Sequence, residues 1–454
     1  MNENQSLYQS VYAESNVFEA WRHVKKSALN SPNKDIRGEA TEFEHRHQTH
    51  LRRISRQLRE NRYQFSPVHG VLKDKIERLK KGKNPRPVAI AKMEDRVVQR
   101  AILQVFQPRR LIDPKDPNSK SELIYDPRLG LMNKINRSEF GVGGLLRPYG
   151  GTEQAIRTIM RAMESGATHF FQSDIKAFFT AIPTAKVIDI VRAETKDECI
   201  CTLFGEALKV DLENEDELKK YSDLFPRDGI GVAQGGSLSA LAGNILLFEF
   251  DHALNTKGVT AVRYIDDVLI VSDSKQKLDD AVHFTKGELS KFNFSLYPPD
   301  KSQGKADEGL CADSFNFLGC TIQPKRCVPS KASVDGKKAQ FSSLIHSSKG
   351  AIKKYLQNGD SLDPKLSQSV VLKRIGDQLY GWQKSFSFCT DEREFETLDN
   401  HVFKLTTDYA QTIQRWNSKV EKQAAAKVLG IPSAREQFIL DKQRRDKRNQ
   451  IGKI

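Results

Sequence analysis

Two short apolar runs separated by an acidic pair form the clearest pattern along the chain. Residues 259–263 and 268–271 are rich in β-branched and aliphatic side chains, which is typical of buried strands. The residues between them, Tyr264 to Asp267, are few enough to form a hairpin turn. Charges near a core must be paired or bound to a metal. Asp266 and Asp267 therefore indicate either a solvent-facing turn or a metal site, and the strongly apolar flanks favour the metal site.

A third carboxylate ends another apolar run. Residues 170–175 read Phe-Phe-Gln-Ser-Asp-Ile, which predicts a strand that ends at Asp174. An isolated acid at a strand end is most often a helix cap or a loop residue. Hard divalent cations such as Mg²⁺ prefer oxygen ligands, and two such ions about 3.5–4 Å apart can clamp the attacking and leaving oxygens of a phosphoryl transfer. Asp174, Asp266 and Asp267 are therefore candidate ligands of a two-metal site.

Helical periodicity accounts for much of the remaining chain. Residues 39–60 combine basic side chains with a regular apolar stripe, which predicts an amphipathic helix, and another helix is predicted over residues 95–106. Ser237 is expected to cap a helix that follows a glycine-rich turn. Residues 194–225 are highly charged and predict a helical excursion on the surface. From residue 331 onward the chain is expected to be helical and basic.

Composition adds a partner and a compartment to this picture. The chain has 454 residues, enough for two or three domains, and a formal net charge of +14, which favours a polyanionic partner. No apolar run has the length of a signal peptide core or a membrane span, so we expect a soluble cytoplasmic protein. The six cysteines lack paired zinc-ligand spacing and are expected to be reduced thiols: Cys199, Cys201, Cys311, Cys320, Cys327 and Cys389.

Several of these segments resemble the conserved blocks of one enzyme family. Tyr264-Ile265-Asp266-Asp267 resembles the Tyr-x-Asp-Asp box of reverse transcriptases, and residues 174–179 are similar to the first catalytic block of that family. Residues 61–67 resemble the Tyr-x-Phe-x-Pro segment that precedes the fingers of group II intron-like reverse transcriptases. The matching blocks follow one another in the family order over roughly residues 40 to 390, which is far more specific than any single box.

The resemblance implies a fold. It is a right-hand polymerase of the α+β class, in which the palm is an antiparallel sheet with helices and the C-terminal region is helical. The implied parts are an N-terminal extension, the fingers, the palm, a helical thumb and a basic C-terminal helix or tail, at residues 1–36, 37–168, 169–325, 326–410 and 411–454.

The resemblance also implies roles for the acids. Asp174 and Asp266 would hold two Mg²⁺ ions, for which Mn²⁺ is a possible substitute, and Asp267 would be a weaker ligand or an electrostatic support. Ile175, directly after Asp174, is assigned to the same metal site.

The segment before the first acid resembles the fingers block of the family. Arg86 and Lys92 in that block are expected to bind the phosphates of the incoming nucleotide, although a solvated strand is the alternative for a single cation. Two positions depart from the family pattern, because Ala91 and Ala233 stand where proline is usual.

Further residues are expected around the nucleotide. Phe179 would exclude a ribose 2′-hydroxyl, whereas Phe178 is expected to be a core residue under the sheet. Gln234 and Gly235 resemble the Pro-Gln-Gly block, in which the glutamine contacts a base or sugar edge. Lys301 would serve the leaving pyrophosphate, with an ordinary surface lysine as the alternative.

A last group is expected to contact template or primer. It comprises a residue of the second block, the tyrosine of the catalytic box, the Phe-Leu-Gly primer grip and a thumb tryptophan: Arg147, Tyr264, Phe317, Leu318, Gly319 and Trp382.

The resemblance implies RNA-directed DNA synthesis from dNTPs on an RNA template, with a DNA product. A primer 3′-oxygen, or a protein hydroxyl in self-priming relatives, would attack the α-phosphorus. The expected setting is a stand-alone bacterial enzyme that copies a dedicated noncoding RNA in antiviral defence. A group II intron maturase is the alternative within the class, and a catalytically idle RNA-binding protein is the alternative outside it. An oligomer or a partner protein remains open.

Overall fold

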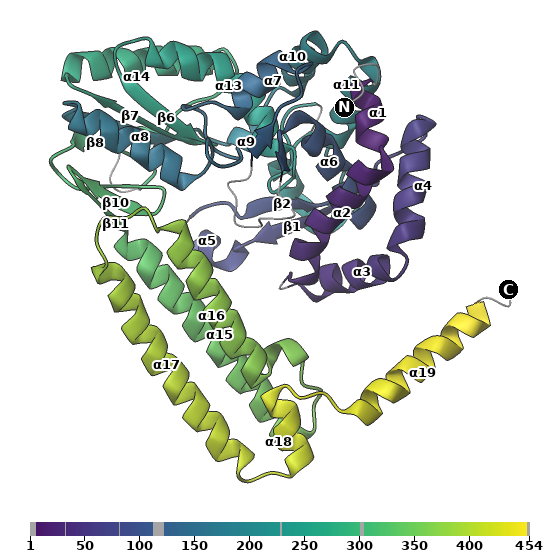
Figure 1. Cartoon of the computed structure of the whole chain (residues 1–454). Coiled ribbons are helices and arrows are strands. Elements are labelled where there is room, and N and C mark those ends of the chain that lie inside the picture. Colours follow the sequence, from purple (N-terminus) through teal and green to yellow (C-terminus); the bar gives the residue numbers. More distant parts are fainter. Residues whose placement is uncertain are drawn as a thin grey trace. The chain divides into compact units, whose positions relative to one another are not determined.

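The computed structural model describes residues 6–31, 33–80, 82–111, 122–227, 229–299 and 304–451. The chain divides into two compact units, residues 1–311 and residues 312–454 (Figure 1).

The first unit is built around a four-stranded antiparallel sheet. Its strands lie in the order β6, β7, β5, β8, with bounds Thr260–Tyr264, Asp267–Ser272, His169–Asp174 and Ala306–Leu310. The two apolar runs predicted as strands are β6 and β7, and they form the predicted hairpin. The predicted strand before Asp174 is β5, which pairs with β7 on one side and β8 on the other.

Both faces of this sheet are covered along β7, which explains why this strand is apolar at successive positions. Along β7, Val268 and Ile270 join a core that includes residues of α13 (Ser239–Asn255) and α14 (Lys275–Ser290). Leu269 and Val271 are equally buried but point to the opposite face. Helix α8 (Thr152–Glu164) lies on that side of the sheet (Figure 1).

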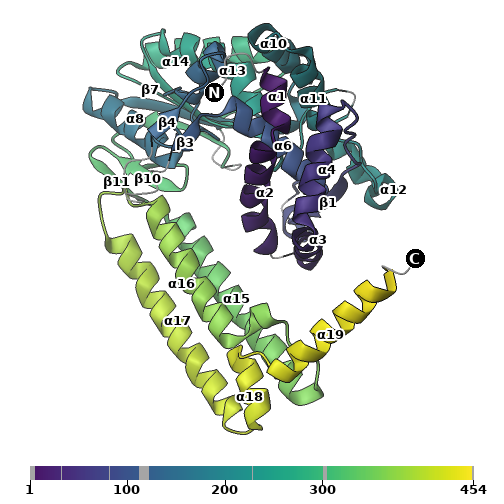
Figure 2. The same cartoon turned by 45° about the vertical axis from the view of Figure 1, so that its right-hand side comes forward.

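Helices at the N-terminus belong to the same core. Trp21 and its neighbours are buried in the cluster that also contains the sheet, and the helices gather around α6 (Figure 2). The predicted helix over residues 39–60 is two helices, because Arg46 leaves the helical conformation with φ −127° and ψ 23°. The helices are α1 (Leu7–Tyr12), α2 (Glu14–Leu29), α3 (Lys34–His45), α4 (His47–Arg59) and α6 (Met93–Phe106).

Shorter elements complete the first unit. Their strands form two antiparallel pairs, β1 (His69–Lys73) with β2 (Arg86–Ile90), and β3 (Arg109–Leu111) with β4 (Glu122–Ile124). The helices are α5 (Lys75–Lys80), α7 (Gly130–Asn136), α9 (Phe178–Ala181), α10 (Thr184–Thr195), α11 (Glu198–Leu208), α12 (Glu215–Leu218) and the 3₁₀ helix η1 (Lys219–Leu224).

The surface excursion predicted for residues 194–225 is wrong over α11. Ile200 and Phe204 of this helix are fully buried. Phe204 also packs edge-on against Phe106 of α6, with ring centroids 5.7 Å apart. In the sequence, charged residues on both sides of this helix make its apolar positions hard to recognise.

The second unit joins a small sheet to a helical bundle. Its strands are β9 (Phe315–Phe317), β10 (Cys320–Gln323) and β11 (Arg326–Pro329), all antiparallel. Helices α15, α16, α17 and α18 share one apolar core. The helices are α15 (Lys331–Asn358), η2 (Pro364–Leu366), α16 (Gln368–Ser385), α17 (Arg393–Asn417), α18 (Lys422–Leu429) and α19 (Ala434–Ile451).

The antiparallel sheets and the helical C-terminal unit confirm the predicted α+β class. Within the described ranges, none of the helices is both long and apolar enough to cross a membrane.

Candidate active site

The structure brings the three predicted acids to one end of the central sheet. The register of β5 and β7 places Asp174 directly opposite Asp267. The backbone nitrogen of Ile175 donates a hydrogen bond of 2.8 Å to the carbonyl oxygen of Asp266. Tyr264 pairs with Asp267 across the hairpin, so Ile265 and Asp266 form the turn. Acids that are far apart in the sequence thus become neighbours through strand pairing.

The turn that carries Asp266 has an unusual backbone. Ile265 has a φ of 64°, in the left-handed region that β-branched residues rarely adopt. Such a conformation persists where the surroundings determine it, and two features of this structure do so.

The first feature is a buried ion pair beneath the turn. The guanidinium of Arg263 on β6 lies 2.6 Å from the carboxylate of Asp251 on α13, and the side chains are 2% and 4% exposed. Arg263 also donates hydrogen bonds to the Ile265 carbonyl at 2.9 Å and to the Asn244 side chain at 3.2 Å. Arg263 is therefore a positioning residue that ties the turn to α13.

The second feature is a glycine segment packed against the same turn. The backbone nitrogen of Val142 donates to the Arg263 carbonyl at 2.9 Å, and that of Arg263 donates to the Phe140 carbonyl at 2.7 Å. A Cβ atom at Gly143 would lie 2.5 Å from the backbone nitrogen of Ile265. Only glycine allows this approach without a shift of the hairpin.

Electrostatics at Asp266 and Asp267 favour a bound cation. Burial, followed by repulsion from Asp267, raises the pKa of Asp266 to about 6, and burial raises the pKa of Asp267 to about 6. The Asp174 side chain is only 14% exposed and forms an ion pair with Lys305. Clustered carboxylates whose ionised forms are disfavoured are a fitting donor set for hard divalent cations.

Lys305 is a residue that the sequence reasoning missed. The predicted lysine of this region, Lys301, lies outside the described residues. Lys305 immediately precedes β8, and its carbonyl accepts a hydrogen bond of 3.1 Å from the backbone nitrogen of Asp174. The pairing of β8 with β5 was the signal needed to find it, and that pairing is not visible in the sequence.

Phe179 and the Gln234 segment lie side by side. The backbone nitrogen of Val232 donates to the Phe179 carbonyl at 2.7 Å. Phe178 is 3% exposed and packs on Phe294 with ring centroids 5.4 Å apart, as expected for a core residue. Phe179 is partly exposed beside it. The two elements that were expected to surround the nucleotide are therefore in contact.

Gln234 and Gly235 line a hollow of about 300 Å³ together with strand β2 and Arg96. This hollow joins the glycine-rich turn to the strand that carries Arg86. The predicted cap at Ser237 is wrong, because α13 begins at Ser239 with Leu238 as the cap residue. The Ser239 hydroxyl instead donates to the Ala233 carbonyl at 2.6 Å, which braces the turn.

The two predicted phosphate contacts differ in their surroundings. Arg86 is 57% exposed, and the nearest oxygen of Asp74 is 3.9 Å away. Its charge acts on Asp266, where it opposes the larger effects of burial and Asp267 on the pKa of that group. Lys92 forms an ion pair of 3.2 Å with Glu213. The charge of Arg86 thus lowers the pKa of Asp266 slightly, whereas Lys92 contacts Glu213.

The predicted template and primer contacts divide between the units. Arg147 is exposed and Tyr264 ends β6 in the first unit. Phe317 ends β9 in the second unit, and Leu318 and Gly319 form the β9–β10 connection, with φ values of 47° and 80°.

Trp382 on α16 is engaged within the second unit. Its ring lies 4.9 Å from that of Phe386 and 5.5 Å from that of Phe395, between centroids. This packing gives the tryptophan a structural role, and its contact with nucleic acid stays a prediction.

Residues 78–322 match the profile of the family described as reverse transcriptase (RNA-dependent DNA polymerase). The match covers more than half of the chain, so the chain belongs to this family, as predicted. Its relatives include proteins encoded by group II introns, which confirms the predicted lineage.

The group II intron-encoded protein LtrA of Lactococcus lactis subsp. cremoris is 28% identical over 202 residues, which are 44% of this chain and 27% of LtrA. An uncharacterized 91 kDa protein in the cob intron of Schizosaccharomyces pombe is 27% identical over 199 residues, 44% of this chain and 20% of that protein. This chain therefore spans about a quarter or less of the length of these relatives. A solved structure titled partial Cas6-RT-Cas1–Cas2 complex aligns with a TM-score of 0.34 at 21% identity, over 63% of this chain and 42% of that chain.

Proposed function

We propose that the protein is an RNA-directed DNA polymerase whose nucleotidyl-transfer site is formed by Asp174, Asp266 and Asp267. One observation carries the proposal. In a chain of the reverse transcriptase family, the register of β5 and β7 sets Asp174 opposite Asp267, with Asp266 at the adjoining turn.

Two divalent metal ions fit these residues. The carboxylates of Asp174 and Asp266 would hold Mg²⁺, or Mn²⁺ in its place, with Asp267 and the backbone of Ile175 in support. When bound, the ions neutralise the charge that develops on the attacking and leaving oxygens of the transferred phosphoryl group.

The chain's own residues then select and orient the reactants. The exposed guanidinium of Arg86 would bind a phosphate of the incoming dNTP. The ring of Phe179 would exclude a 2′-hydroxyl, and Gln234 would hydrogen-bond the nucleotide from the turn that contacts Phe179. Lys92 and Lys301 are proposed to assist at the phosphates.

RNA template and primer would be contacted by residues of both units. Within the first unit these are Arg147 and Tyr264, and within the second they are the β9–β10 connection and Trp382. The net charge of +14 supports a nucleic-acid partner.

The template is proposed to be a dedicated noncoding RNA in antiviral defence. Group II intron RNA is the competing template, and it is favoured by the intron-encoded relatives. Sequencing the RNA that copurifies with the protein distinguishes them, because only a maturase would enrich intron RNA.

The activity is tested by incorporation of labelled dNTPs on a primed RNA template. Asp266→Ala and Asp174→Ala are each expected to lose at least about 100-fold, because removal of one charge-stabilising group costs about 10²–10³ in rate. Asp273→Ala is the matched control. Asp273 also follows the apolar part of β7, but its side chain is 56% exposed and pairs with Lys277.

Equal incorporation by wild type and Asp266→Ala would reject the polymerase and favour an idle RNA-binding protein. Circular dichroism melts of each variant show whether the fold is kept. Removal of the Asp266 carboxylate relieves its repulsion from Asp267 and should not unfold the sheet.

A further inference from the structure

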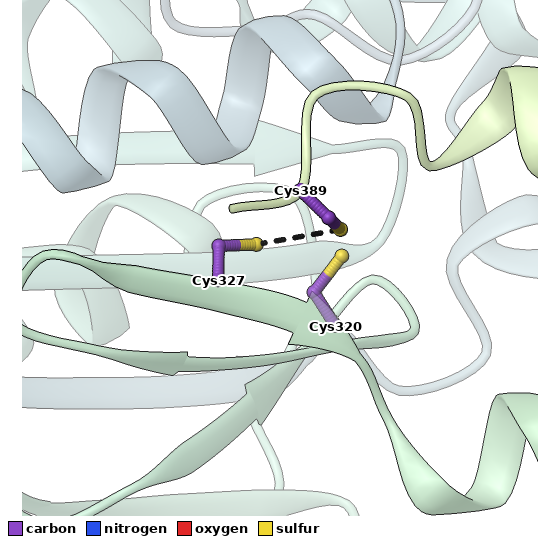
Figure 3. Close-up of side chains that lie close together, drawn as sticks. All are labelled: Cys320, Cys327 and Cys389. Carbon is purple, nitrogen blue, oxygen red and sulfur yellow. Dashed lines mark hydrogen bonds between the residues drawn. The ribbon is translucent and has the colours of Figure 1, made fainter. Parts of the chain in front are cut away.

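Three cysteines of the second unit converge on one point. The Sγ atoms of Cys320, Cys327 and Cys389 all lie within 4.8 Å of one another. Those of Cys327 and Cys389 are 4.0 Å apart. Figure 3 shows the three side chains directed toward each other from different segments of the chain. Cys320 and Cys327 are fully buried and Cys389 is partly buried.

Strand pairing and backbone hydrogen bonds hold the three cysteines in this arrangement. Cys320 begins β10, and Cys327 on β11 is opposite Ile322, so the two cysteines are diagonal neighbours on one face of the hairpin. Cys389 lies in the connection between α16 and α17. The backbone nitrogen of Thr390 donates to the Cys327 carbonyl at 2.8 Å, and that of Cys327 donates to the Thr390 hydroxyl at 3.0 Å.

The spacing of the sulfur atoms suits a metal better than a disulfide. A tetrahedral Zn²⁺ with Zn–S bonds of about 2.3 Å has neighbouring sulfurs about 3.8 Å apart. The distances of 4.0 Å and up to 4.8 Å require only a small inward movement of the side chains. A disulfide needs sulfurs about 2.05 Å apart and would leave the third thiol unpaired. Without a metal, the three cysteines would pack as small apolar residues.

Soft thiolate ligands select soft or borderline metals, and zinc fits a redox-inert tetrahedral site. Within the described ranges, no fourth cysteine, histidine or acid joins the group. A hollow of about 700 Å³ borders Cys389, Thr390 and Asp391, and water or a small ligand from it would supply the fourth ligand.

We propose that Cys320, Cys327 and Cys389 form a zinc site that fastens the α16–α17 connection to the β10–β11 hairpin. The metal reinforces hydrogen bonds that already join these segments. Because β10 directly follows Gly319, the site also stabilises the predicted primer grip. That last consequence depends on the proposed polymerase function, whereas zinc binding does not.

The sequence prediction for these residues is incomplete. All six cysteines are free thiols in the structure, as expected. The lack of a paired zinc-ligand motif, however, did not exclude a site. Its ligands come from two strands and a distant helix connection, which only the tertiary structure brings together.

The test measures zinc by elemental mass spectrometry in full-length protein purified without a metal-affinity step. Wild type is expected to retain one zinc per chain, and Cys327→Ser and Cys389→Ser are expected to lose most of it. Cys311→Ser is the matched control, because Cys311 is buried but lies outside the cluster. Asp266→Ala separates the two proposals, because it should abolish synthesis and keep the zinc.

A second measurement does not depend on how well the variants fold. Cobalt is substituted into wild-type protein, and thiolate-to-cobalt charge-transfer absorption with tetrahedral d–d bands is expected. The same bands should occur in Cys311→Ser. Absence of zinc and of these bands in wild type overturns the proposal, as does equal zinc in wild type and both cluster variants.

Discussion

The two units each gather three ligating side chains, but of opposite chemical character. The first unit places the carboxylates of Asp174, Asp266 and Asp267 at a sheet end, where all three are partly exposed. The second places three thiols among buried strands and a helix connection, with Cys320 and Cys327 fully buried. Hard, accessible oxygens suit ions that exchange and share ligands with phosphates. Soft, buried sulfurs suit an ion that is retained for structure.

The contacts that hold the carboxylates in place also differ from those that hold the thiols. A buried ion pair and a glycine contact hold the carboxylate turn in a left-handed conformation. The thiols rest on ordinary strand pairing and on hydrogen bonds to Thr390. A reactive site therefore depends on strain that distant residues maintain, and this dependence can be tested variant by variant.

The largest effect is expected for Asp251→Asn. The substitution leaves the guanidinium of Arg263 buried without its counter-charge, which costs about 3–5 kcal/mol of unfolding free energy. Urea denaturation measures the loss. Zinc content should be unchanged, since the thiols lie in the other unit.

The paired variant Asp251→Leu with Arg263→Met is the control, because removal of both charges is expected to restore much of the stability. If the unfolding free energy of Asp251→Asn lies within about 1 kcal/mol of the wild-type value, the role given to Arg263 is wrong.

Gly143→Ala should have the next largest effect. Its Cβ would lie 2.5 Å from the Ile265 nitrogen, and overpacking of this kind costs about 1–3 kcal/mol. Because the collision is with the turn that carries Asp266, dNTP incorporation should fall more than stability does. Gly287→Ala is the matched control, since nothing lies within 4 Å of its added atom and alanine favours the helix. Equal activity in both variants would show that the turn tolerates displacement.

The smallest effect concerns pH in the absence of divalent metal. The folded pKa of Asp266 is raised to about 6 by burial and by Asp267. The stability that this group contributes is present below its unfolded pKa of about 3.9 and is lost as the pH rises through about 6. Asp266→Asn should therefore match wild type near pH 4 and exceed it by about 1–2 kcal/mol near pH 8.

Urea denaturation across this pH range measures the difference, and added Mg²⁺ should reduce it by stabilising wild type. The cysteine variant Cys311→Ser should show no such pH dependence relative to wild type. A difference between Asp266→Asn and wild type that is constant with pH would contradict the burial of this carboxylate.

Local pattern was sufficient to predict the β6–β7 hairpin and the strand before Asp174. The run of residues 268–271 is buried at every position and Phe170 and Phe171 are buried in β5, so both strands show as apolar runs in the sequence. The different surroundings of Phe178 and Phe179 also followed from the family block.

Features that depend on tertiary pairing could not be predicted in this way. The burial of α11 and the ion pair of Lys305 with Asp174 arise from neighbours that are distant in sequence. The same holds for the three thiols, whose ligand spacing exists only in space.

The proposed polymerase requires the acids of β5 and of the β6–β7 turn to hold divalent metal jointly. Crystals soaked with Mn²⁺ and a dNTP analogue that cannot be incorporated test it most directly, through anomalous scattering. Two anomalous peaks are expected next to the nucleotide phosphates, each liganded by Asp174 or Asp266. A nucleotide bound elsewhere, with no anomalous peak at these carboxylates, would contradict it.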